Sequence, residues 1–402
     1  MIKYLILGAG PAGLAFANRL LENGEKSFLV LEKESQAGGL CRSENVDGSP
    51  LDIGGGHFLD VRRPNVNEFL FRFMPEKEWN LFSRDSRISL PFGEINHPFE
   101  ANIWQFPQEK QVEYLKSIAI APCNLGLPKP EVFVDWIEWK LGKKIALDYM
   151  IPYNQKMFGE NLNQLGTYWL EKLPNVSFEE TLLSCLNKKA YGTQPGHAQF
   201  YYPKKYGYGE LWLRMAQNLG QNIKYNVTVK EIDTETTGIV LADGTKLNSQ
   251  YIITTIPWTC VAVKGLPSEL REHIGELKYT SVNITYKNEN LETKAHWIYY
   301  PDMSLDYHRI LVRSNFCNDS KGYWTETNST RFKSSDDFTY KNEYAYPLNT
   351  RNKREIMKSL LGFVKSRNIT GLGRWGEWEH YNSDLTVQKA MELADAFFLI
   401  ME

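Results

Sequence analysis

Glycine and charged residues near the start of the chain are spaced in a way that suits a phosphorylated nucleotide. The turn Gly8-Ala9-Gly10-Pro11-Ala12-Gly13 follows a short apolar run, Tyr4 to Leu7. In such a turn the first glycine permits the tight bend, the second lets the backbone approach a pyrophosphate, and the third lets a helix pack against a strand. Glu32 follows ~20 residues later, where an acid can accept hydrogen bonds from ribose hydroxyls. The pattern predicts a dinucleotide site that includes Glu32 and its neighbour Lys33.

Two more glycine turns follow this unit. Gly38-Gly39-Leu40-Cys41-Arg42-Ser43 places a cation and a hydroxyl beside a second turn, an arrangement that looks like the second phosphate-side motif of flavoproteins and favours FAD over NAD. In Gly54-Gly55-Gly56, followed by His57, the absence of side chains would let the backbone lie against a flat flavin ring. The alternatives are an ordinary glycine loop at the first site and a flexible loop with a surface histidine at the second.

The elements that position these residues form an α/β pattern. We expect a strand at Tyr4–Leu7, a helix at Leu14–Leu21 and a strand at Phe28–Leu31, because a short apolar run, a helical run and a second apolar run alternate there. Further expectations are a hairpin over Ile88–Ile95, mainly helical structure over residues 107–188 with a stop at Gly142, strands at Val227–Ile232, Gly238–Leu241 and Tyr251–Ile256, a helix at Leu211–Leu219, strand-like alternation over 277–315, and a C-terminal helix from about Thr386.

These elements predict a Rossmann-like FAD-binding domain interleaved with a mainly helical domain and an antiparallel β-sheet substrate domain. The expected FAD-binding domain comprises residues 1–60, 197–262 and 368–402. The substrate domain comprises 61–106 and 263–350, and the helical domain 107–196.

Composition narrows the classes of function. The 402 residues carry 46 basic and 48 acidic side chains, a net charge of -2, which disfavours a general nucleic-acid binder. The five cysteines form no CxxC pair, so we expect no disulfide framework or zinc site and a cytoplasmic location. We expect no membrane insertion, because no stretch reaches the ~18 apolar residues that a span needs. The chain has no HExxH or GxSxG motif, so metal and serine catalysis are disfavoured.

The chain resembles UDP-galactopyranose mutases, particularly the eukaryotic type, within the wider FAD-dependent amine-oxidase superfamily. The landmarks that carry the resemblance come in the order of that family: Gly55-Gly56-His57, Asn96-His97-Pro98-Phe99 with Asn102, Pro152 to Phe158, Tyr202-Pro203 to Gly209, Trp297 to Pro301, Arg309, Ser314-Asn315-Phe316, Gly373-Arg374-Trp375-Gly376 and Asp384.

The resemblance implies that reduced flavin acts as a nucleophile. Its N5 atom forms an adduct with the sugar of a nucleotide sugar, UDP leaves, and the sugar recloses with another ring size. The implied catalytic residues are His57, Arg309 and Arg374. The implied cofactor contacts are Gly8, Gly10, Pro11, Ala12, Gly13, Glu32, Lys33, Gly38, Gly39, Leu40, Gly55, Gly56, His57, Val229, Gly373, Arg374, Asp384, Leu385 and Thr386. The implied substrate contacts are His97, Phe99, Glu100, Asn102, Asn154, Phe158, His197, Tyr299, Arg309, Phe316 and Tyr346.

The sequence also departs from that family. No arginine follows the segment around Asn154, where the family has a phosphate-binding one, and Lys172 is the substitute to consider. Arg62 and Arg63 are the candidates to compensate. Because of these departures, a nucleotide sugar other than UDP-galactose fits as well, and a UDP-sugar is the first class of substrate to test. An FAD-dependent amine-oxidase-like oxidoreductase and a flavin-binding protein without turnover stay as alternatives, and a homo-oligomer is left open.

Overall fold

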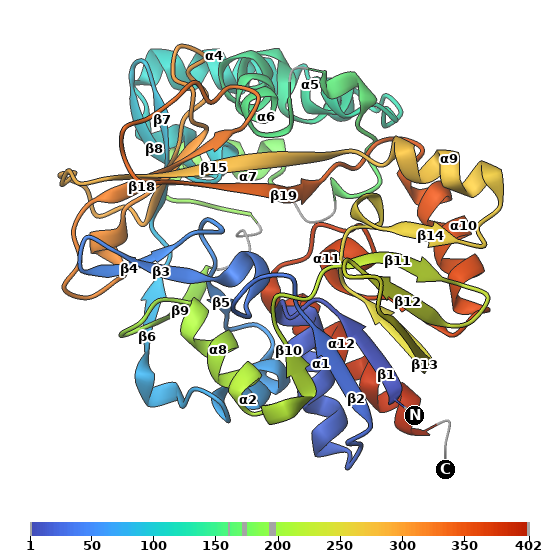
Figure 1. Cartoon of the computed structure of the whole chain (residues 1–402). Helices are drawn as coiled ribbons and strands as arrows, with labels where there is room; N and C mark the ends of the chain where they lie inside the picture. The colour runs from blue at the N-terminus through green and yellow to red at the C-terminus, as the bar shows by residue number, and fades with distance from the viewer. Residues whose placement is uncertain (1, 160, 171–174, 193–197, 400–402) are drawn as a thin grey trace.

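Two large β-sheets organise the chain. In a computed structural model, residues 2–159, 161–170, 175–192 and 198–399 are described. The long strands β15 (Tyr279–Lys287) and β19 (Thr339–Pro347) cross the middle of the molecule (Figure 1). The helices α4 (Gln108–Ala119), α5 (Phe133–Ile145) and α6 (Ile151–Phe158) lie on one side of them, and the sheet that contains the N-terminal strand lies on the other.

The first sheet holds the nucleotide-type turn. Its strands run in the order β10 (Ile223–Lys224), β2 (Phe28–Leu31), β1 (Ile2–Leu7), β13 (Lys246–Thr254), β12 (Gly238–Leu241), β11 (Val229–Asp233) and β14 (Ala262–Lys264), and β20 (Ile369–Gly371) also pairs with β13. The four strands β10, β2, β1 and β13 are parallel, as is the pair of β13 with β20. Parallel strands covered on both faces are apolar throughout, and Leu5, Ile6 and Leu7 are fully buried.

Helices pack against this sheet and against one another around it. They are α1 (Pro11–Glu22), α2 (Pro64–Phe71), α8 (Gly209–Gln217), α9 (Ser268–Glu276), α10 (Lys353–Lys365), the short α11 (Gly373–Gly376) and α12 (Ser383–Leu399). Helix α1 begins at Pro11, earlier than expected, because a proline suits the first helical position, where its missing N–H costs nothing. The C-terminal helix likewise begins at Ser383, before Thr386.

The second sheet is mostly antiparallel. Its order is β19, β15, β18 (Tyr323–Asn328), β17 (Arg309–Leu311), β16 (Trp297–Tyr299), β7 (Ser86–Leu90) and β8 (Gly93–Asn96). The strands β7 and β8 form the expected hairpin, with Arg87 opposite Asn96. Two smaller sheets, β3 (Ser43–Val46) with β4 (Ser49–Asp52), and β5 (Leu59–Asp60) with β9 (Gln199–Pro203) and β6 (Trp79–Ser83), connect the large ones.

The helical layer consists of α3 (Phe99–Asn102), α4 (Gln108–Ala119), α5 (Phe133–Ile145), α6 (Ile151–Phe158) and α7 (Phe178–Asn187). Gly142 interrupts α5 with a φ of 73°, so the predicted helix stop is observed as a kink. A side chain there would overlap the backbone of Ser117 on α4. This layer packs around its own core, which includes Phe99, Tyr114 and Ile137.

The predicted fold class is confirmed: a Rossmann-like parallel sheet, a helical layer and an antiparallel sheet are all present. The domain boundaries given above stay a prediction. Across the described ranges, no helix combines the length and apolar character that crossing a bilayer requires.

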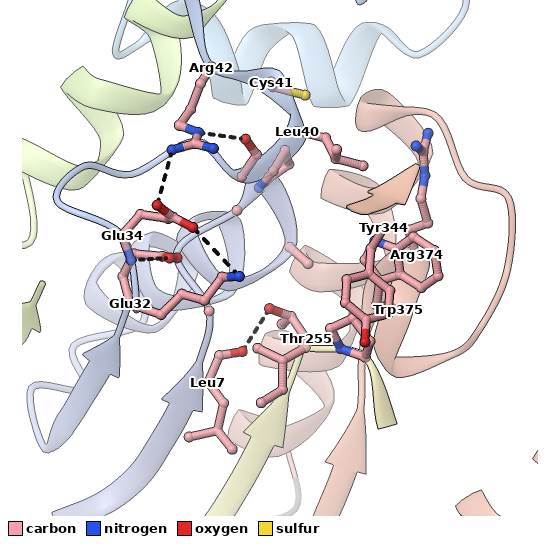
Figure 2. Close-up of a pocket in the computed structure, with 18 of the residues that line it drawn as sticks. Leu7, Glu32, Glu34, Leu40, Cys41, Arg42, Thr255, Tyr344, Arg374 and Trp375 are labelled. Atoms are coloured by element: carbon pink, nitrogen blue, oxygen red, sulfur yellow. Dashed lines mark hydrogen bonds and ion pairs between the residues drawn. The ribbon is translucent and has the colours of Figure 1, made fainter. Parts of the chain in front are cut away.

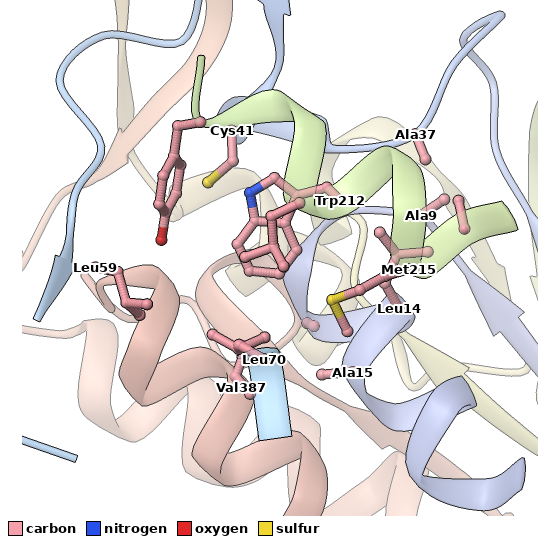
Figure 3. Close-up of a cluster of buried hydrophobic side chains, with 14 of the residues drawn as sticks. Ala9, Leu14, Ala15, Ala37, Cys41, Leu59, Leu70, Trp212, Met215 and Val387 are labelled. Carbon is pink, nitrogen blue, oxygen red and sulfur yellow. The ribbon is translucent and has the colours of Figure 1, made fainter. Parts of the chain in front are cut away.

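One apolar core joins the parts of the molecule that surround the glycine turns. Trp212 of α8 is fully buried. Figure 3 shows it with Met215 of the same helix, close to Leu14 of α1 and Val387 of α12. The indole nitrogen of Trp212 has no hydrogen-bond partner among the described residues, so its contribution to stability comes from packing.

We therefore predict that Trp212→Ala lowers the free energy of unfolding by about 3–5 kcal/mol, because it leaves a large cavity in this core. Trp212→Phe keeps an aromatic ring and loses no hydrogen bond, because the indole nitrogen has no partner among the described residues. It removes fewer buried atoms and leaves a smaller cavity than Trp212→Ala, so it should cost less. Urea unfolding of both variants measures the difference. Equal losses in the two variants would contradict this account of the core.

Candidate functional site

A cavity of about 470 Å³ lies at the carboxyl ends of the parallel strands β1, β2 and β13. Ligands of open α/β sheets bind at this edge. The turn after β1, residues 32–34 after β2 and residues 255–257 after β13 line it. Figure 2 shows Glu32, Glu34 and Arg42 on one side of the cavity and Tyr344 and Trp375 on the other.

The turn at Gly8–Gly13 has the geometry that its sequence predicts. Gly8 has a φ of 101°, in the left-handed region that favours glycine. A side chain at Gly13 would overlap the carbonyl oxygen of Gly8, so the third glycine allows α1 to lie close to β1. Gly10 is the N-cap residue of α1, and the first turn of this helix contains no acidic residue. The positive end of the helix dipole therefore lies beside the cavity.

Glu32 holds this turn in place and lines the cavity. Its Oε2 accepts a hydrogen bond from the backbone N–H of Ala9 at 2.7 Å, and its Oε1 accepts one from the N–H of Glu34 at 3.0 Å. A carboxylate can accept about four hydrogen bonds. Glu32 therefore keeps acceptor capacity for the hydroxyls of a ligand.

The second glycine turn packs against the first. The N–H of Gly38 donates to the carbonyl of Ala9 at 2.8 Å, and Gly38 has a φ of 116°. Arg42 lines the cavity, where it donates to the carbonyl of Gly39 at 3.0 Å and to the Tyr340 hydroxyl at 2.6 Å. The cation predicted beside this turn is therefore at the cavity wall.

A smaller cavity of about 200 Å³ adjoins the larger one, because His57, Arg374 and Ser383 line both. Much of its wall is one face of the second sheet. Tyr299, Arg309, Glu326 and Ile284 lie opposite one another across the strands β16, β17, β18 and β15. Side chains that pair across neighbouring strands point to the same face, so the register of the sheet brings these four together.

The carboxylate of Glu326 is the centre of this wall, and its side chain is only 1% exposed. Its Oε2 accepts from the guanidinium of Arg309, with Nε at 2.9 Å, and its Oε1 accepts from the N–H of Gly56 at 3.0 Å. Burial opposes the charge on Arg309, but the Glu326 carboxylate and the neighbouring tyrosine hydroxyls together outweigh it, and the pKa of Arg309 lies well above its ordinary value. Arg309 is therefore a fixed cation.

Arg374 lies at the boundary of the two cavities. It donates to the carbonyl of Ala345 at 3.0 Å and, from two nitrogens, to the carbonyl of Tyr381 at 2.8 and 3.1 Å. Burial lowers its pKa, although an arginine in a protein remains charged. The ring of Tyr346, which lines the smaller cavity, lies 6.0 Å from the guanidinium carbon of Arg374.

Most of the predicted cofactor contacts line one of the two cavities, and the others lie outside both described linings. Those that line the larger cavity are Gly8, Gly10, Pro11, Ala12, Glu32, Lys33, Gly39, Leu40, His57, Val229, Arg374 and Thr386. Gly56 lines the smaller cavity. The others, which lie outside the described lining of either cavity, are Gly13, Gly38, Gly55, Gly373, Asp384 and Leu385. Of these, Gly373 packs on Ala12, where a Cβ would come within 2.6 Å of the alanine side chain.

The glycine triplet owes its composition to contacts within the protein. A side chain at Gly54 would overlap the carbonyl of Leu40, and one at Gly56 would overlap Leu311. At Gly55 a Cβ would come within 2.8 Å of a Glu326 carboxylate oxygen. Close packing within the protein is therefore one reason for the three glycines, and the contact of their backbone with a flat ring stays a prediction. The loop carries His57 to the boundary of the two cavities.

Of the predicted substrate contacts, Tyr299, Arg309 and Tyr346 line the smaller cavity. His97 lies outside the described lining of this cavity. Its Nδ1 is 3.1 Å from a terminal guanidinium nitrogen of Arg84, which does line the cavity. The segment after His97 turns into the helical layer. Phe99 stacks on Tyr149, and Asn102 donates to the carbonyl of Pro98 at 2.8 Å.

Four more predicted contacts lie away from both described linings. Glu100 is partly enclosed, and this desolvation raises its pKa. Asn154 donates to the carbonyl of Met150, Phe158 packs against Trp169, and Phe316 is buried against Tyr202 and Trp324. Roles for these residues stay predictions. His197 and Lys172 lie outside the described residues.

Arg62 and Arg63 are the candidates to replace the missing phosphate-binding arginine, and both form ion pairs within the protein. Arg62 forms an ion pair with Asp60 at 2.7 Å, and Arg63 pairs with the buried carboxylate of Asp384. Both lie outside the described lining of the smaller cavity. Asp60 of β5 and Asp384 at the start of α12 bind these two arginines, and a compensating role for Arg62 and Arg63 stays a prediction.

Arg84 and Glu326 line the smaller cavity and were missed by sequence reasoning. Arg84 lies two residues before β7, and Glu326 lies inside β18. Local signals are weak at both positions: Arg84 precedes the alternating strand β7, and Glu326 lies in the polar run Thr325–Asn328 of β18. Which face such a residue occupies depends on strand order and register, which the sequence does not reveal.

Two family profiles match parts of the chain. The profile described as NAD(P)-binding Rossmann-like domain matches residues 6–73, and the one described as flavin containing amine oxidoreductase matches residues 140–330. An uncharacterized protein in the nifH2 3' region of Methanothermococcus thermolithotrophicus is 49% identical over 53 residues. That match spans 13% of this chain and 50% of the relative, so the chain accounts for half the length of that protein.

Solved structures match the whole chain. A crystal structure of reduced UDP-galactopyranose mutase has a TM-score of 0.91 at 22% identity and covers 100% of this chain and 96% of its own. Cyclohexylamine oxidase from Brevibacterium oxydans IH-35A has a TM-score of 0.68 at 13% identity, covering 100% and 99%. The resemblance stated from the sequence is thereby confirmed for the fold. Together with the two profiles, these matches support a mutase-like flavoprotein fold with a flavin cofactor.

A buried carboxyl group lies behind the candidate site. Asp52 accepts hydrogen bonds from the Tyr202 hydroxyl at 3.0 Å and from the N–H of Tyr208 at 3.2 Å, and it also accepts one from Ser43. Burial raises the pKa of Asp52 to about 7, although these three donors favour the charged form. The folded protein therefore binds a proton at Asp52 that the unfolded chain has already released above pH ~4.

We predict that this group lowers the stability of the protein as the pH rises from ~4 to ~7, by up to ~4 kcal/mol. Asp52→Asn should remove this dependence, so the variant should gain stability relative to the wild type between pH 5 and pH 8. Urea unfolding at both pH values measures the effect. Asp243→Asn, at an exposed turn, is the control. A wild type and an Asp52→Asn variant with parallel pH profiles would contradict the assignment.

Proposed function

We propose that the chain binds FAD in the larger cavity and interconverts ring forms of a nucleotide sugar, first of all a UDP-hexose, in the smaller one. The observation that carries this proposal is the charge of the smaller cavity. Its described lining contains three arginines and one glutamate, and it adjoins the larger cavity at His57, Arg374 and Ser383. A cationic recess beside a cofactor cavity suits a substrate whose leaving group is a diphosphate.

The larger cavity fits FAD in its donors and acceptors. The N-terminus of α1 and the glycine turn suit a pyrophosphate, and Glu32 suits a ribose. Ser383 and Thr386, at the start of α12, would lie near the flavin end, because Ser383 also lines the smaller cavity. When bound and reduced, a flavin supplies a nucleophile for the anomeric carbon of the sugar.

Arg309 and Arg374 would stabilise the negative charge that builds on the departing diphosphate. Each is held before the substrate arrives, Arg309 by Glu326 and Arg374 by two backbone carbonyls. Donors fixed in advance need no reorganisation during the reaction, and their effect is larger where water is excluded. Phe58, Trp297, Met157, Val282 and Ile284 supply the apolar part of the wall that would exclude it.

At the boundary between the two cavities, His57 would accept a proton and Tyr346 would donate a hydrogen bond to the substrate. The Nδ1 atom of His57 lies 3.0 Å from the carbonyl of Gly55, and because a carbonyl only accepts, Nδ1 carries the proton. In the neutral ring, Nε2 is then the nitrogen that accepts a proton. Burial raises the pKa of Tyr346, so its hydroxyl stays protonated and can donate to a phosphate or a sugar oxygen.

The second candidate is an FAD-dependent amine-oxidase-like oxidoreductase, favoured by the match of residues 140–330 to flavin containing amine oxidoreductases. An amine substrate carries a positive charge at neutral pH. The excess of arginine in the smaller cavity would repel it. The charge of the wall therefore favours the nucleotide sugar. Flavin binding without turnover is the remaining outcome.

We predict that the dithionite-reduced protein converts UDP-galactopyranose, or another UDP-hexopyranose, to its furanose form. Arg309→Met should lower kcat by about 10²–10³-fold, the usual cost of losing a fixed donor at a developing anion. Arg309→Lys should recover only part of the rate, because a lysine lacks the planar fork of donors. Chromatography of the sugar nucleotides and the flavin absorbance of each variant are the measurements.

Oxygen consumption with an amine, combined with no new sugar nucleotide across the panel, would replace this proposal with the oxidase. Bound flavin with neither activity would support a binding protein.

A further inference from the structure

We propose that Arg84 is a diphosphate-binding residue of the smaller cavity and that it makes the site select a nucleoside diphosphate over a monophosphate. The choice of ligand rests on the proposed function. Arg84 lines the cavity together with Arg309 and Arg374. It comes from the segment just before β7, on the opposite side of Tyr299 from Glu326 in the strand order.

The side chain of Arg84 is held in one orientation by groups from three segments. Its Nε donates to the Ser86 hydroxyl at 2.7 Å, and one terminal nitrogen lies 3.1 Å from Nδ1 of His97 and 3.2 Å from the Tyr299 hydroxyl. The guanidinium carbon lies 4.9 Å from the ring centre of Trp297. This stacking fixes the plane of the fork of donors.

The groups around Arg84 support the fork without cancelling its charge. Burial lowers the pKa of His97 well below its ordinary value, and the charge of Arg84 acts in the same direction. The ring is therefore neutral, and its Nδ1 can accept the hydrogen bond from Arg84. Trp297 donates its indole N–H to the Tyr299 hydroxyl at 2.9 Å, so the tyrosine is itself held in position.

The summed charge of the residues that line the smaller cavity matches a ligand with two negative charges. The ionisable residues of the described lining are His57, Arg84, Tyr299, Arg309, Glu326, Tyr346, Arg374 and His380. Glu326 already binds Arg309 and the N–H of Gly56. With neutral imidazoles, the three guanidinium groups and one carboxylate leave an excess of two positive charges.

An anion bound beside Arg84 would stabilise its buried positive charge. Burial lowers the pKa of Arg84, and the charge of Arg309 acts in the same direction. An arginine does not escape such an environment by losing its proton. A phosphoryl group between Arg84 and Arg309 would relieve the repulsion between them and accept hydrogen bonds from both. A second phosphoryl group beside Arg374 would complete a diphosphate, whereas a monophosphate would leave one side of this arrangement without a ligand.

The test is calorimetric titration of the flavin-loaded, oxidised protein with UDP, UMP and inorganic pyrophosphate in metal-free buffer. Arg84→Met should weaken UDP and pyrophosphate by about 10–100-fold, the range of a lost hydrogen bond to a charged group. It should weaken UMP less, so that the preference for UDP over UMP shrinks. Arg84→Lys should recover part of the loss.

Arg87→Met is the matched control. Arg87 lies in β7, three residues after Arg84, pairs with Asp85 at 3.1 Å and Glu94 at 3.5 Å, and is outside the described lining of the cavity. Its removal should leave all three affinities unchanged. Flavin absorbance and thermal unfolding show whether each variant is folded and loaded.

Equal affinity of the wild type and Arg84→Met for UDP and for pyrophosphate would overturn the proposal, as would a wild type that binds neither. Failure of the mutase function gives a different result. In that case pyrophosphate binding would still depend on Arg84, while no UDP-hexose would be converted by the reduced wild type.

Discussion

The buried carboxylate of Glu326 connects the second sheet to the loop that separates the two cavities. One of its oxygens binds Arg309 on the neighbouring strand, and the other accepts the N–H of Gly56 at 3.0 Å. Removing one partner of a buried ion pair typically costs 3–5 kcal/mol, because a charge is left in a poorly solvated place. The position of Arg309 and the path of the Gly54–His57 loop are therefore set by the same group. The absence of a side chain at Gly55 is what lets the loop come this close.

The positive charge of the smaller cavity comes from three arginines that neighbouring parts of the fold hold in position. Arg309 pairs with Glu326 through the register of β17 with β18. Arg374 is fixed by carbonyl groups of β19 and of the segment after α11, and Arg84 by the start of β7 and by Trp297. Three cations from separate parts of the chain thus meet in one enclosed volume beside the cofactor cavity. Such clustering is costly in the absence of an anion, which is why we infer an anionic ligand.

The sequence predicts the nucleotide side of the molecule well, because its signals are local. The turn at Gly8–Gly13, the helix after it and Glu32 lie within one strand–helix–strand unit, so spacing alone positions them. The substrate side depends on contacts between distant segments. Glu326 and Arg84 come to line the same cavity only because β18 and β7 belong to one sheet, in an order that the sequence does not reveal. Local pattern could not distinguish Phe99 as a pocket residue from Phe99 as part of the helical core, and the structure places it in the core.

The same reasoning explains the glycine triplet. Three adjacent glycines indicate that the backbone approaches something closely, but not what. The neighbours turn out to be Leu40, Glu326 and Leu311, which are distant in the sequence. A tertiary neighbour of this kind is visible only in the folded chain.

The charge of the smaller cavity favours an anion rather than an amine beside the proposed flavin site. The most direct measurement is the visible absorption difference spectrum of the flavin-bound protein during titration with UDP and, separately, with an aliphatic amine. We expect a saturable change with UDP that pyrophosphate competes away and that salt weakens, and no saturable change with the amine. A saturable change with the amine and none with UDP would contradict it.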